Sequence, residues 1–559
     1  METGSTTAEG LALLRGCLTG RCIAMGLTGS LLLLSVGSWP ARATDRLEVE
    51  IDGIVLPVLV EDLRSFGRLG NRSRSELAAW LNLLDPASRE GLARLLNAPV
   101  LTRSSLGQQL LSSWGAGALI DALGALVRVE GGGHISSAEV LPTLERLLDQ
   151  QEKVSTLDVL QALPNEQLRL DLNALLKSAS HWRQQLERHN NLMAVLAAEP
   201  STRQANPQPV KTARLELSQS NGPELMDLLV RHRESPIQIQ TWSASVSSAS
   251  VFSASSDAPS DRPWLLFMPG LGGDPEHFHW LAEALTKAGW NVVIIEHPGS
   301  DAEAIQALLD GRQSFDGARA LRQRLLDLDA VLEAQRKGRI PVEGTNVVLV
   351  GHSLGGLAAL LAAGADPVPG IDRRCRQSLA AIPLTNLSEL LQCELADSRA
   401  LNTAPMDPQP IAVVGLNSFG GLIWPSGKQT RPLVMPLLLF GGTLDLITPP
   451  LDEQIPLLRG LGHHPLSRVV VVEGASHFSP IRIESQAGSL QGNDLFQLGE
   501  ELVGVNPLTV QTLIAQEIIR FLEQLEAKSP TAAVGHFDAG TTRWHRLNRS
   551  AANQLTGDL

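Results

Sequence analysis

The sequence of 559 residues contains no tyrosine and only 4 cysteines, and its acidic residues outnumber the basic ones. Without tyrosine, hydroxyl chemistry is left to serine and threonine, and a common donor for a developing oxyanion is missing. The 46 Lys and Arg residues stand against 59 Asp and Glu residues, and they form no basic run. A nucleic-acid partner requires such a basic feature, so we expect no nucleic acid to bind.

Long apolar runs are also scarce, and the candidate near the N-terminus covers residues 23–36. This run is shorter than the roughly 20 apolar residues that a membrane-spanning helix needs. Arg15 and Arg21 precede it, and Ala41-Arg42-Ala43 follows it with the small residues that a signal peptidase reads. We therefore predict a signal peptide over residues 1–43 and an exported protein, periplasmic or extracellular. An uncleaved membrane anchor is the alternative.

Removal of the signal peptide would leave two of the cysteines, Cys375 and Cys393. An even pair in an oxidising compartment is a candidate disulfide. Two buried free thiols are the alternative, and the sequence does not decide between them.

The region after the signal predicts a small, mostly helical domain over residues 44–198. Apolar residues alternate with polar ones from Leu47 to Val58 around Asp52-Gly53, which is typical of a β-hairpin. The apolar period then becomes helical, and Ser136 with Glu139 has the form of a capping box. The domain shows no catalytic set, so we expect it to serve packing or contact with an unidentified protein partner. A polar, proline-containing linker follows at residues 199–212.

Short apolar runs alternate with helical segments in residues 213–528. The runs expected to form strands are residues 237–242, 264–268, 292–295, 347–350, 411–414, 437–440 and 469–472. Such alternation implies crossover connections, so we predict an α/β domain with a mainly parallel sheet and helices on both faces. The tail over residues 529–559 lacks clear periodicity and is predicted to be disordered.

The motif G-H-S-L-G places Ser353 between the apolar run at 347–350 and an Ala/Leu-rich helical segment at 354–363. A serine at a strand-to-helix turn is the context of a nucleophile elbow. Gly351 and Gly355 let the backbone pass close to its neighbours. We therefore interpret Ser353 as a nucleophile.

A nucleophilic serine needs a base, and the base needs a group that orients it. Asp445 follows the run at 437–440, and His477 follows the run at 469–472, so acid and histidine come in the order that nucleophile elbows require. Taken alone, Asp445 could instead cap the segment that starts at Pro449. Glu473 is the reserve acid, although it lies only four positions before His477.

Acyl transfer also requires donors for the oxyanion. The backbone N–H of Leu354 is one candidate, and Leu271 in the glycine-rich P-G-L-G-G loop is the other. The pair His277-x-His279 lacks the cysteines or carboxylates of a metal site, so we expect no metal and no cofactor.

At these residues the sequence resembles the α/β-hydrolase superfamily. Within it the sequence is similar to platelet-activating-factor acetylhydrolases and to bacterial proteins labelled predicted dienelactone hydrolases. The motifs are G-H-S-L-G-G, P-G-L-G-G, E-H-P-G-S-D, G-T-L-D-L-I-T-P-P and E-G-A-S-H-F-S, within about residues 215–528. The segment from 46 to about 197 resembles a domain of unknown function that precedes such hydrolases in exported bacterial proteins. The oxyanion loop departs from many relatives, because it begins Pro269-Gly270 where they have H-G.

This resemblance implies an α/β-hydrolase fold and a serine esterase or lipase, with short-acyl phospholipid esters among the substrates. A dienelactone substrate does not fit, because enzymes of that activity use cysteine and this chain offers Ser353. We expect a small-molecule or lipid ester as substrate and peripheral contact with a membrane. The alternatives are a peptidase or thioesterase on the same three residues, or a binding protein that acts through its helical domain. Ile423, Trp424, Leu490, Leu495 and Phe496 would suit an acyl chain or ordinary packing.

Overall fold

The computed structural model describes a large part of the chain. The described ranges are residues 46–51, 54–69, 77, 96, 99–102, 120–129, 133–151, 153–163, 165, 167–203, 222–244, 262–309, 315–395, 401, 406–426, 430–481, 505–528, 534–540 and 542–557. The predicted signal peptide, residues 1–43, lies outside them. No helix among these residues is long and apolar enough to cross a membrane.

The described residues of the N-terminal region combine helices with short strands. The predicted hairpin is confirmed, since the first two strands pair antiparallel, but two later strands complete a four-stranded sheet in the order β2-β1-β6-β4. These two strands have three and five residues, too few for a period of two to stand out. The elements are β1 (Arg46–Ile51), β2 (Ile54–Leu59), α1 (Val60–Leu69), β3 (Pro99–Thr102), β4 (Val127–Val129), α6 (Ser137–Gln150), β5 (Lys153–Ser155), α7 (Thr156–Ala162) and β6 (Gln167–Asp171).

Helix α8 (Leu172–Ala198) follows this sheet and packs on the second domain. Leu192 and Leu196 near its C-terminal end are 1% exposed and belong to the same apolar core as the large sheet. Earlier in the helix, Trp182 Nε1 donates a hydrogen bond to the Ile382 carbonyl at 2.6 Å. The C-terminal half of α8 is therefore part of the second domain's core, although its sequence position groups it with the first.

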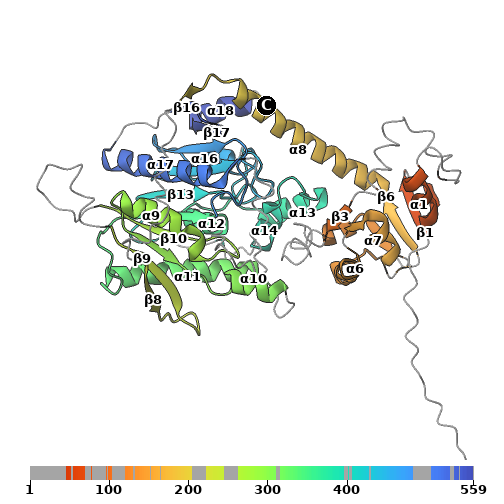
Figure 1. Ribbon diagram of the computed structural model, residues 1–559, viewed down its shortest axis with the longest axis horizontal. Coiled ribbons are helices and arrows are strands. Elements are labelled where there is room, and N and C mark those ends of the chain that lie inside the picture. Colours follow the sequence, from red (N-terminus) through yellow and green to blue (C-terminus); the bar gives the residue numbers. More distant parts are fainter. Residues whose placement is uncertain are drawn as a thin grey trace, which may run out of the picture. The chain divides into compact units, whose positions relative to one another are not determined.

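The second domain contains an eleven-stranded sheet, with helices on both of its faces (Figure 1). Its strand order is β7-β16-β17-β15-β14-β13-β12-β10-β11-β9-β8. The strands β11, β10, β12, β13, β14 and β15 are parallel to their neighbours in this group, which confirms the predicted α/β class. All seven strands expected from the sequence are present.

The elements of this domain are the following. The strands are β7 (Thr202–Arg203), β8 (Glu224–Leu228), β9 (Ile237–Trp242), β10 (Trp264–Met268), β11 (Val292–Ile295), β12 (Val347–His352), β13 (Ala412–Leu416), β14 (Leu437–Gly442), β15 (Arg468–Val472), β16 (Gly535–Ala539) and β17 (Thr542–Asn548). The helices are η3 (Pro275–Phe278), α9 (His279–Lys287), α10 (Ala302–Leu309), α11 (Gly317–Arg336), α12 (Leu354–Ala362), α13 (Ile371–Ala381), α14 (Ser388–Glu394), α16 (Gln454–Leu461), α17 (Pro507–Glu526) and α18 (Arg549–Gly557).

Successive residues of each central strand enter different cores on the two faces of the sheet. In β12, Val347 and Leu349 pack with α11, α12 and α16, whereas Val348 and Val350 pack with α9 and α17. Side chains alternate across a strand, and a strand buried on both faces therefore reads as a continuous apolar run. This burial explains why the central strands were visible in the sequence.

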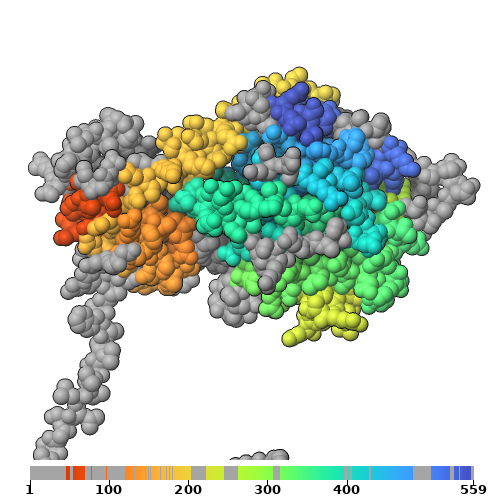
Figure 2. All heavy atoms as spheres, turned by 180° about the vertical axis from the view of Figure 1, so that it is seen from behind, coloured from red at the N-terminus to blue at the C-terminus, as the bar shows by residue number. Residues whose placement is uncertain are grey.

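Within the tail that the sequence predicted to be disordered, residues 534–540 and 542–557 form strands and a helix. Strand β17 pairs antiparallel with β15, and Trp544 is 2% exposed. The prediction failed because charged residues of β17 are buried with partners: Arg546 Nε lies 2.7 Å from Glu517 Oε2. Arg543 Nη1 also donates to the Ala197 carbonyl at 2.9 Å, and Figure 2 shows the dark blue C-terminal segment beside the yellow end of α8. Tertiary pairing therefore orders a segment that looks polar in sequence.

Candidate active site

Ser353 stands at the junction of β12 and α12 in a strained conformation. Its φ is 52° and its ψ is −116°, outside the regions that L-residues favour. The turn is tight, because a Cβ added to Gly355 would lie 2.0 Å from the Met268 carbonyl oxygen. Non-glycine residues persist in such conformations where the surrounding structure enforces them, and these places cluster at functional sites. The backbone geometry is that of the nucleophile elbow expected from the motif.

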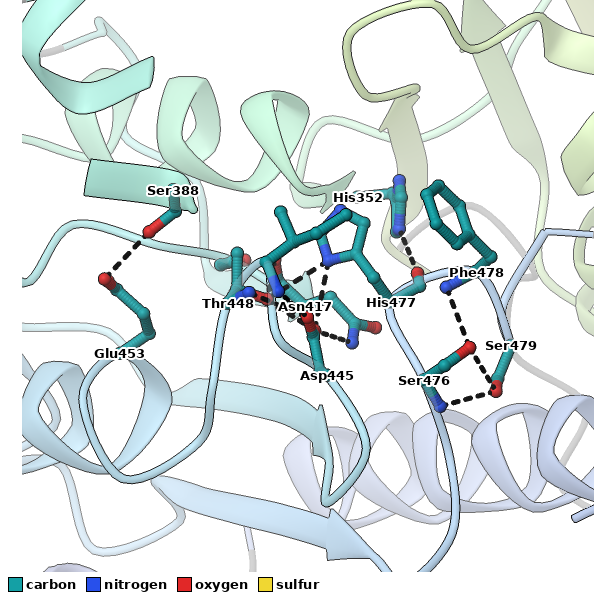
Figure 3. Close-up of polar contacts among 12 residues, drawn as sticks. His352, Ser388, Asn417, Asp445, Thr448, Glu453, Ser476, His477, Phe478 and Ser479 are labelled. Atoms are coloured by element: carbon teal, nitrogen blue, oxygen red, sulfur yellow. Dashed lines mark hydrogen bonds and ion pairs between the residues drawn. The ribbon is translucent and has the colours of Figure 1, made fainter. Parts of the chain in front are cut away.

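His477 and Asp445 meet beyond the ends of β15 and β14 (Figure 3). His477 Nδ1 lies 3.0 Å from Asp445 Oδ2, and both side chains are buried. Asp445 Oδ1 accepts hydrogen bonds from the backbone N–H groups of Ile447 at 2.9 Å and Thr448 at 2.7 Å. One carboxylate oxygen therefore shapes the turn, as the capping alternative proposed, while the other faces the imidazole.

Two side chains that the sequence reasoning missed complete the surroundings of Asp445. Asn417 Nδ2 donates to Asp445 Oδ2 at 2.7 Å, and Thr448 Oγ1 donates to the same oxygen at 2.6 Å. Thr448 could have been found from its place three residues after Asp445, a spacing common in turns that a carboxylate caps. Asn417 follows β13 with φ of 49°, and only the sheet order brings it to Asp445.

The carboxyl group of Asp445 is held in its ionised form. Burial alone would raise its pKa, but the charge of His477 and the hydrogen bonds from His477 and Thr448 outweigh burial and lower the pKa to about 2. An ionised carboxylate beside Nδ1 favours the tautomer whose Nδ1 carries hydrogen, so that Nε2 is free to accept a proton. This is the arrangement that a general base requires.

Glu473, the reserve acid, points elsewhere. Its Oε1 lies 2.9 Å from His545 Nε2, and Arg543 Nε is 3.8 Å from the same oxygen. Since both partners belong to β17, Glu473 joins the C-terminal hairpin to the end of β15. Asp445 is therefore the acid that meets His477.

His352, directly before the elbow serine, supports the loop of His477. His352 Nε2 lies 3.1 Å from the His477 carbonyl oxygen, and because a carbonyl only accepts, Nε2 carries the hydrogen. Burial and the nearby charge of His477 lower the pKa of His352 to about 3, so this imidazole is neutral at ordinary pH. Its contact with the loop was not predicted from the sequence.

The two candidate oxyanion donors belong to two loops that meet at the elbow turn. Leu354 is the first residue of α12, and the first N–H groups of a helix have no partner within the helix. The loop of Leu271 lies against the serine, because a Cβ added to Gly270 would be 3.1 Å from Ser353 Cβ. The structure thus brings both loops to Ser353.

The candidate acyl-chain residues divide into two groups. Ile423 and Trp424 are 0% and 1% exposed and belong to the apolar core, which favours the packing alternative. Leu490, Leu495 and Phe496 lie outside the described residues. Within the described part of the chain, no three His, Cys, Asp or Glu side chains are arranged to hold a metal ion.

Helices α13 and α14 form a bonded pair beside the loop of Asp445. The sulfur atoms of Cys375 and Cys393 are joined in a disulfide. The backbone N–H of Leu387 donates to the Leu446 carbonyl at 3.1 Å, and that of Ser388 donates to the Ile447 carbonyl at 2.7 Å. Ser388 Oγ also donates to the buried carboxylate of Glu453 at 2.9 Å (Figure 3). This network ties the helix pair to the turn that carries the acid.

The pKa of Glu389 in α14 predicts a pH-dependent stability. Burial and the charges of Glu453 and Asp452 raise this pKa from 4.5 to about 7, against a hydrogen bond from Ser378. The folded state then binds the proton more tightly than the unfolded chain, so the free energy of unfolding falls as pH rises from 4.5 to about 7. In urea unfolding near pH 8, Glu389→Gln is expected to exceed the wild-type stability by about 1–3 kcal/mol.

Near pH 4 the wild-type glutamate is mostly protonated in both states, and the gain of Glu389→Gln should be close to zero. Glu333→Gln, at an exposed helix position, is the control and should show no such gain near pH 8. An equal effect of Glu389→Gln at both pH values would contradict the raised pKa.

Two family profiles match this chain. Residues 265–486 match the alpha/beta hydrolase family, and residues 43–171 match a family described as alpha/beta hydrolase of unknown function (DUF1400). Among curated proteins, none matches.

Several solved esterases resemble the chain at low similarity. Esterase 2 of Thermogutta terrifontis, phosphoramylated by tabun, is 16% identical, with a TM-score of 0.28, over 54% of this chain and 97% of that one. Ferulic acid esterase from Streptomyces cinnamoneus is 16% identical, with a TM-score of 0.33, over 54% of this chain and 89% of its own. Est1E from Butyrivibrio proteoclasticus is 12% identical, with a TM-score of 0.30, over 55% and 99%. Likeness at this level carries no information about substrate.

The profile match agrees with the architecture described above. The matched residues contain the parallel strands β11, β10, β12, β13, β14 and β15, and the elbow at Ser353 lies after the third of these strands in the chain. The domain has the α/β-hydrolase fold, and its residues 265–486 match the alpha/beta hydrolase family.

Proposed function

We propose that this protein is a serine hydrolase of carboxylic esters that uses Ser353, His477 and Asp445. The observation that carries the proposal is the contact of 3.0 Å between His477 Nδ1 and the ionised Asp445, together with a serine held at φ of 52° at the end of β12. Strain at the serine and a carboxylate on the histidine are both features that an esterase needs. Neither is needed for a protein that only binds.

In the proposed reaction, His477 Nε2 takes the proton of Ser353 Oγ while that oxygen attacks the ester carbonyl carbon. The tetrahedral oxyanion is held by the N–H groups of Leu271 and Leu354. His477 then gives the proton to the leaving alcohol, which yields an acyl-enzyme. Water, deprotonated by the same imidazole, releases the carboxylic acid and restores Ser353.

The proposed substrates are small or lipid esters, including phospholipids with short acyl groups, and the proposed location is outside the cytoplasm. Export is supported by the disulfide between Cys375 and Cys393, since disulfides persist in oxidising compartments. Cleavage of residues 1–43 and peripheral contact with a lipid surface belong to the same proposal, and an uncleaved signal that anchors the chain is the alternative to cleavage.

The test is hydrolysis of p-nitrophenyl esters from acetate to palmitate by the purified full-length chain. We expect turnover, and the acyl length with the highest kcat/KM distinguishes an esterase for short acyl groups from a lipase. Mass spectrometry after reaction with a fluorophosphonate should find the adduct on Ser353. A chain that neither hydrolyses any of these esters nor takes up the label would contradict the proposal.

A further inference from the structure

A fully buried arginine lies beneath the loop that carries the candidate oxyanion donor. Arg324 in α11 is 0% exposed. Its Nη1 donates to the Pro269 carbonyl at 2.5 Å, and its Nη2 donates to the Gly270 carbonyl at 2.8 Å. The remaining bonds go to Ser300, from Nε to Oγ at 2.8 Å and from Nη2 to the carbonyl at 3.1 Å. One guanidinium group thus joins two loops.

The hydrogen bond to Gly270 determines where the next N–H points. The carbonyl of Gly270 and the N–H of Leu271 belong to the same planar peptide group, and in a trans peptide they point in opposite directions. A Cβ added to Gly270 would lie 3.1 Å from Ser353 Cβ, so this peptide is beside the elbow. Holding the carbonyl on Arg324 therefore directs the N–H of Leu271 away from α11.

The loop is also held at Gly272. The N–H of Gly272 donates to the Ser300 carbonyl at 2.9 Å, and that carbonyl also accepts from Arg324. The peptide group of Leu271 lies between these two attachments. Its orientation is therefore set before a substrate arrives, which is the condition for effective stabilisation of an oxyanion.

Arg324 keeps its charge although it is buried. Burial lowers its pKa to about 9, opposed by the charges of Asp327 and Asp301, so the guanidinium is protonated at neutral pH. Asp327 itself accepts from Arg233 Nε at 2.6 Å and lies 2.9 Å from His297 Nδ1. A carbonyl that accepts from a cation polarises its peptide group, and the N–H of that group becomes a stronger donor.

We propose that Arg324 is a positioning residue for the oxyanion: through the Gly270 carbonyl, it orients and polarises the peptide group whose N–H, on Leu271, binds the developing charge. This inference rests on the proposed ester hydrolysis. It assigns a role in turnover to a side chain that has no contact with Ser353, His477 or Asp445 in the described hydrogen bonds.

The test compares Arg324→Met with the wild-type full-length chain on a p-nitrophenyl ester. Loss of one oxyanion donor typically costs about a hundredfold to a thousandfold in kcat, and for a misdirected and less polarised donor we expect a decrease of about 10- to 100-fold with little change in KM. A trifluoromethyl ketone, which forms a tetrahedral oxyanion on the serine, should bind more weakly by a similar factor. A purely structural role would not move kcat and this affinity together.

Two further variants control for folding. Arg468→Met removes another buried arginine, whose Nη1 donates to Gln524 at 2.7 Å at the start of β15, and it should keep the wild-type kcat. Arg324→Lys keeps the charge but loses the planar fork that spans two loops. If Arg324→Met does not melt cooperatively, the same measurements on Arg324→Lys are expected to show a decrease in kcat of about fivefold to tenfold with KM unchanged.

The role of Arg324 would be overturned if a folded Arg324→Met variant kept the wild-type kcat and the wild-type affinity for the ketone. If Arg324→Met does not fold, the same result for Arg324→Lys would overturn it. In both cases the proposed ester hydrolysis would stand. An Arg468→Met variant that lost as much kcat as Arg324→Met would also overturn it, because the effect would then follow from burial alone. If the wild-type chain showed no ester hydrolysis, or hydrolysis that Ser353→Ala did not abolish, the proposed function itself would be contradicted.

Discussion

Ser353→Ala is expected to reduce kcat for a p-nitrophenyl ester by about 10⁵-fold or more, the largest effect of any single substitution in this chain. Without the hydroxyl group no acyl-enzyme can form, and the residual rate comes from the oxyanion donors and from binding alone. The conformation at φ of 52° should persist, because it is enforced by the surrounding backbone and not by the side chain. Stopped-flow and steady-state assays on the same preparation provide the measurement.

A matched control is Ser467→Ala. Ser467 is 1% exposed, and its Oγ accepts a hydrogen bond from the Leu437 N–H at 3.0 Å. Its loss should lower stability by about 1 kcal/mol and leave kcat within twofold of the wild-type value. A Ser353→Ala variant that keeps more than a tenth of the wild-type kcat would mean that Ser353 is not the nucleophile.

Asp445→Asn is expected to reduce kcat by about 10³- to 10⁴-fold. The carboxylate accepts hydrogen bonds at both oxygens, and an amide offers only one accepting oxygen. Wherever the amide is oriented, its NH₂ group meets a donor, either His477 Nδ1 or the N–H groups of Ile447 and Thr448. The imidazole would then turn or take the wrong tautomer, while KM should change little. Steady-state kinetics across pH provide the measurement.

Glu473→Gln distinguishes the two candidate acids. Glu473 bonds to His545 in β17, so its substitution should cost stability and leave kcat within a few-fold of the wild-type value. If Glu473→Gln lowered kcat as much as Asp445→Asn does, the assignment of the acid would be wrong.

The buried strands and the elbow were predictable because they depend on local sequence. Val347 to Val350 form a continuous apolar run, and such a run in a parallel sheet needs no knowledge of its neighbours. Glycines on both sides of Ser353 reflect a close backbone approach that any such turn demands. The serine, the acid and the histidine each come directly after a different predicted strand, so their order along the chain could be read from the sequence.

The hydrogen-bond partners of the site were not predictable in the same way. Asn417, Thr448 and Arg324 act on atoms of Asp445 and Gly270, and for two of the three the contact joins residues more than 25 positions apart. Unlike Thr448, which follows Asp445 by three residues, Asn417 and Arg324 carry no period and no motif. Their roles depend on which strand lies beside which, and that order is a property of the assembled sheet.

The C-terminal segment also separates what local sequence predicts from what only tertiary contacts determine. Sequence alone determined the class of the fold, the positions of its central strands and the three residues of the candidate site, because burial on both faces of a sheet and tight turns leave local marks. Only the tertiary structure decided that β17 pairs with β15 and that Arg546 is buried against Glu517. The reason is physical: a charged side chain can be buried only where a distant partner compensates its charge, and that partner is known only after folding.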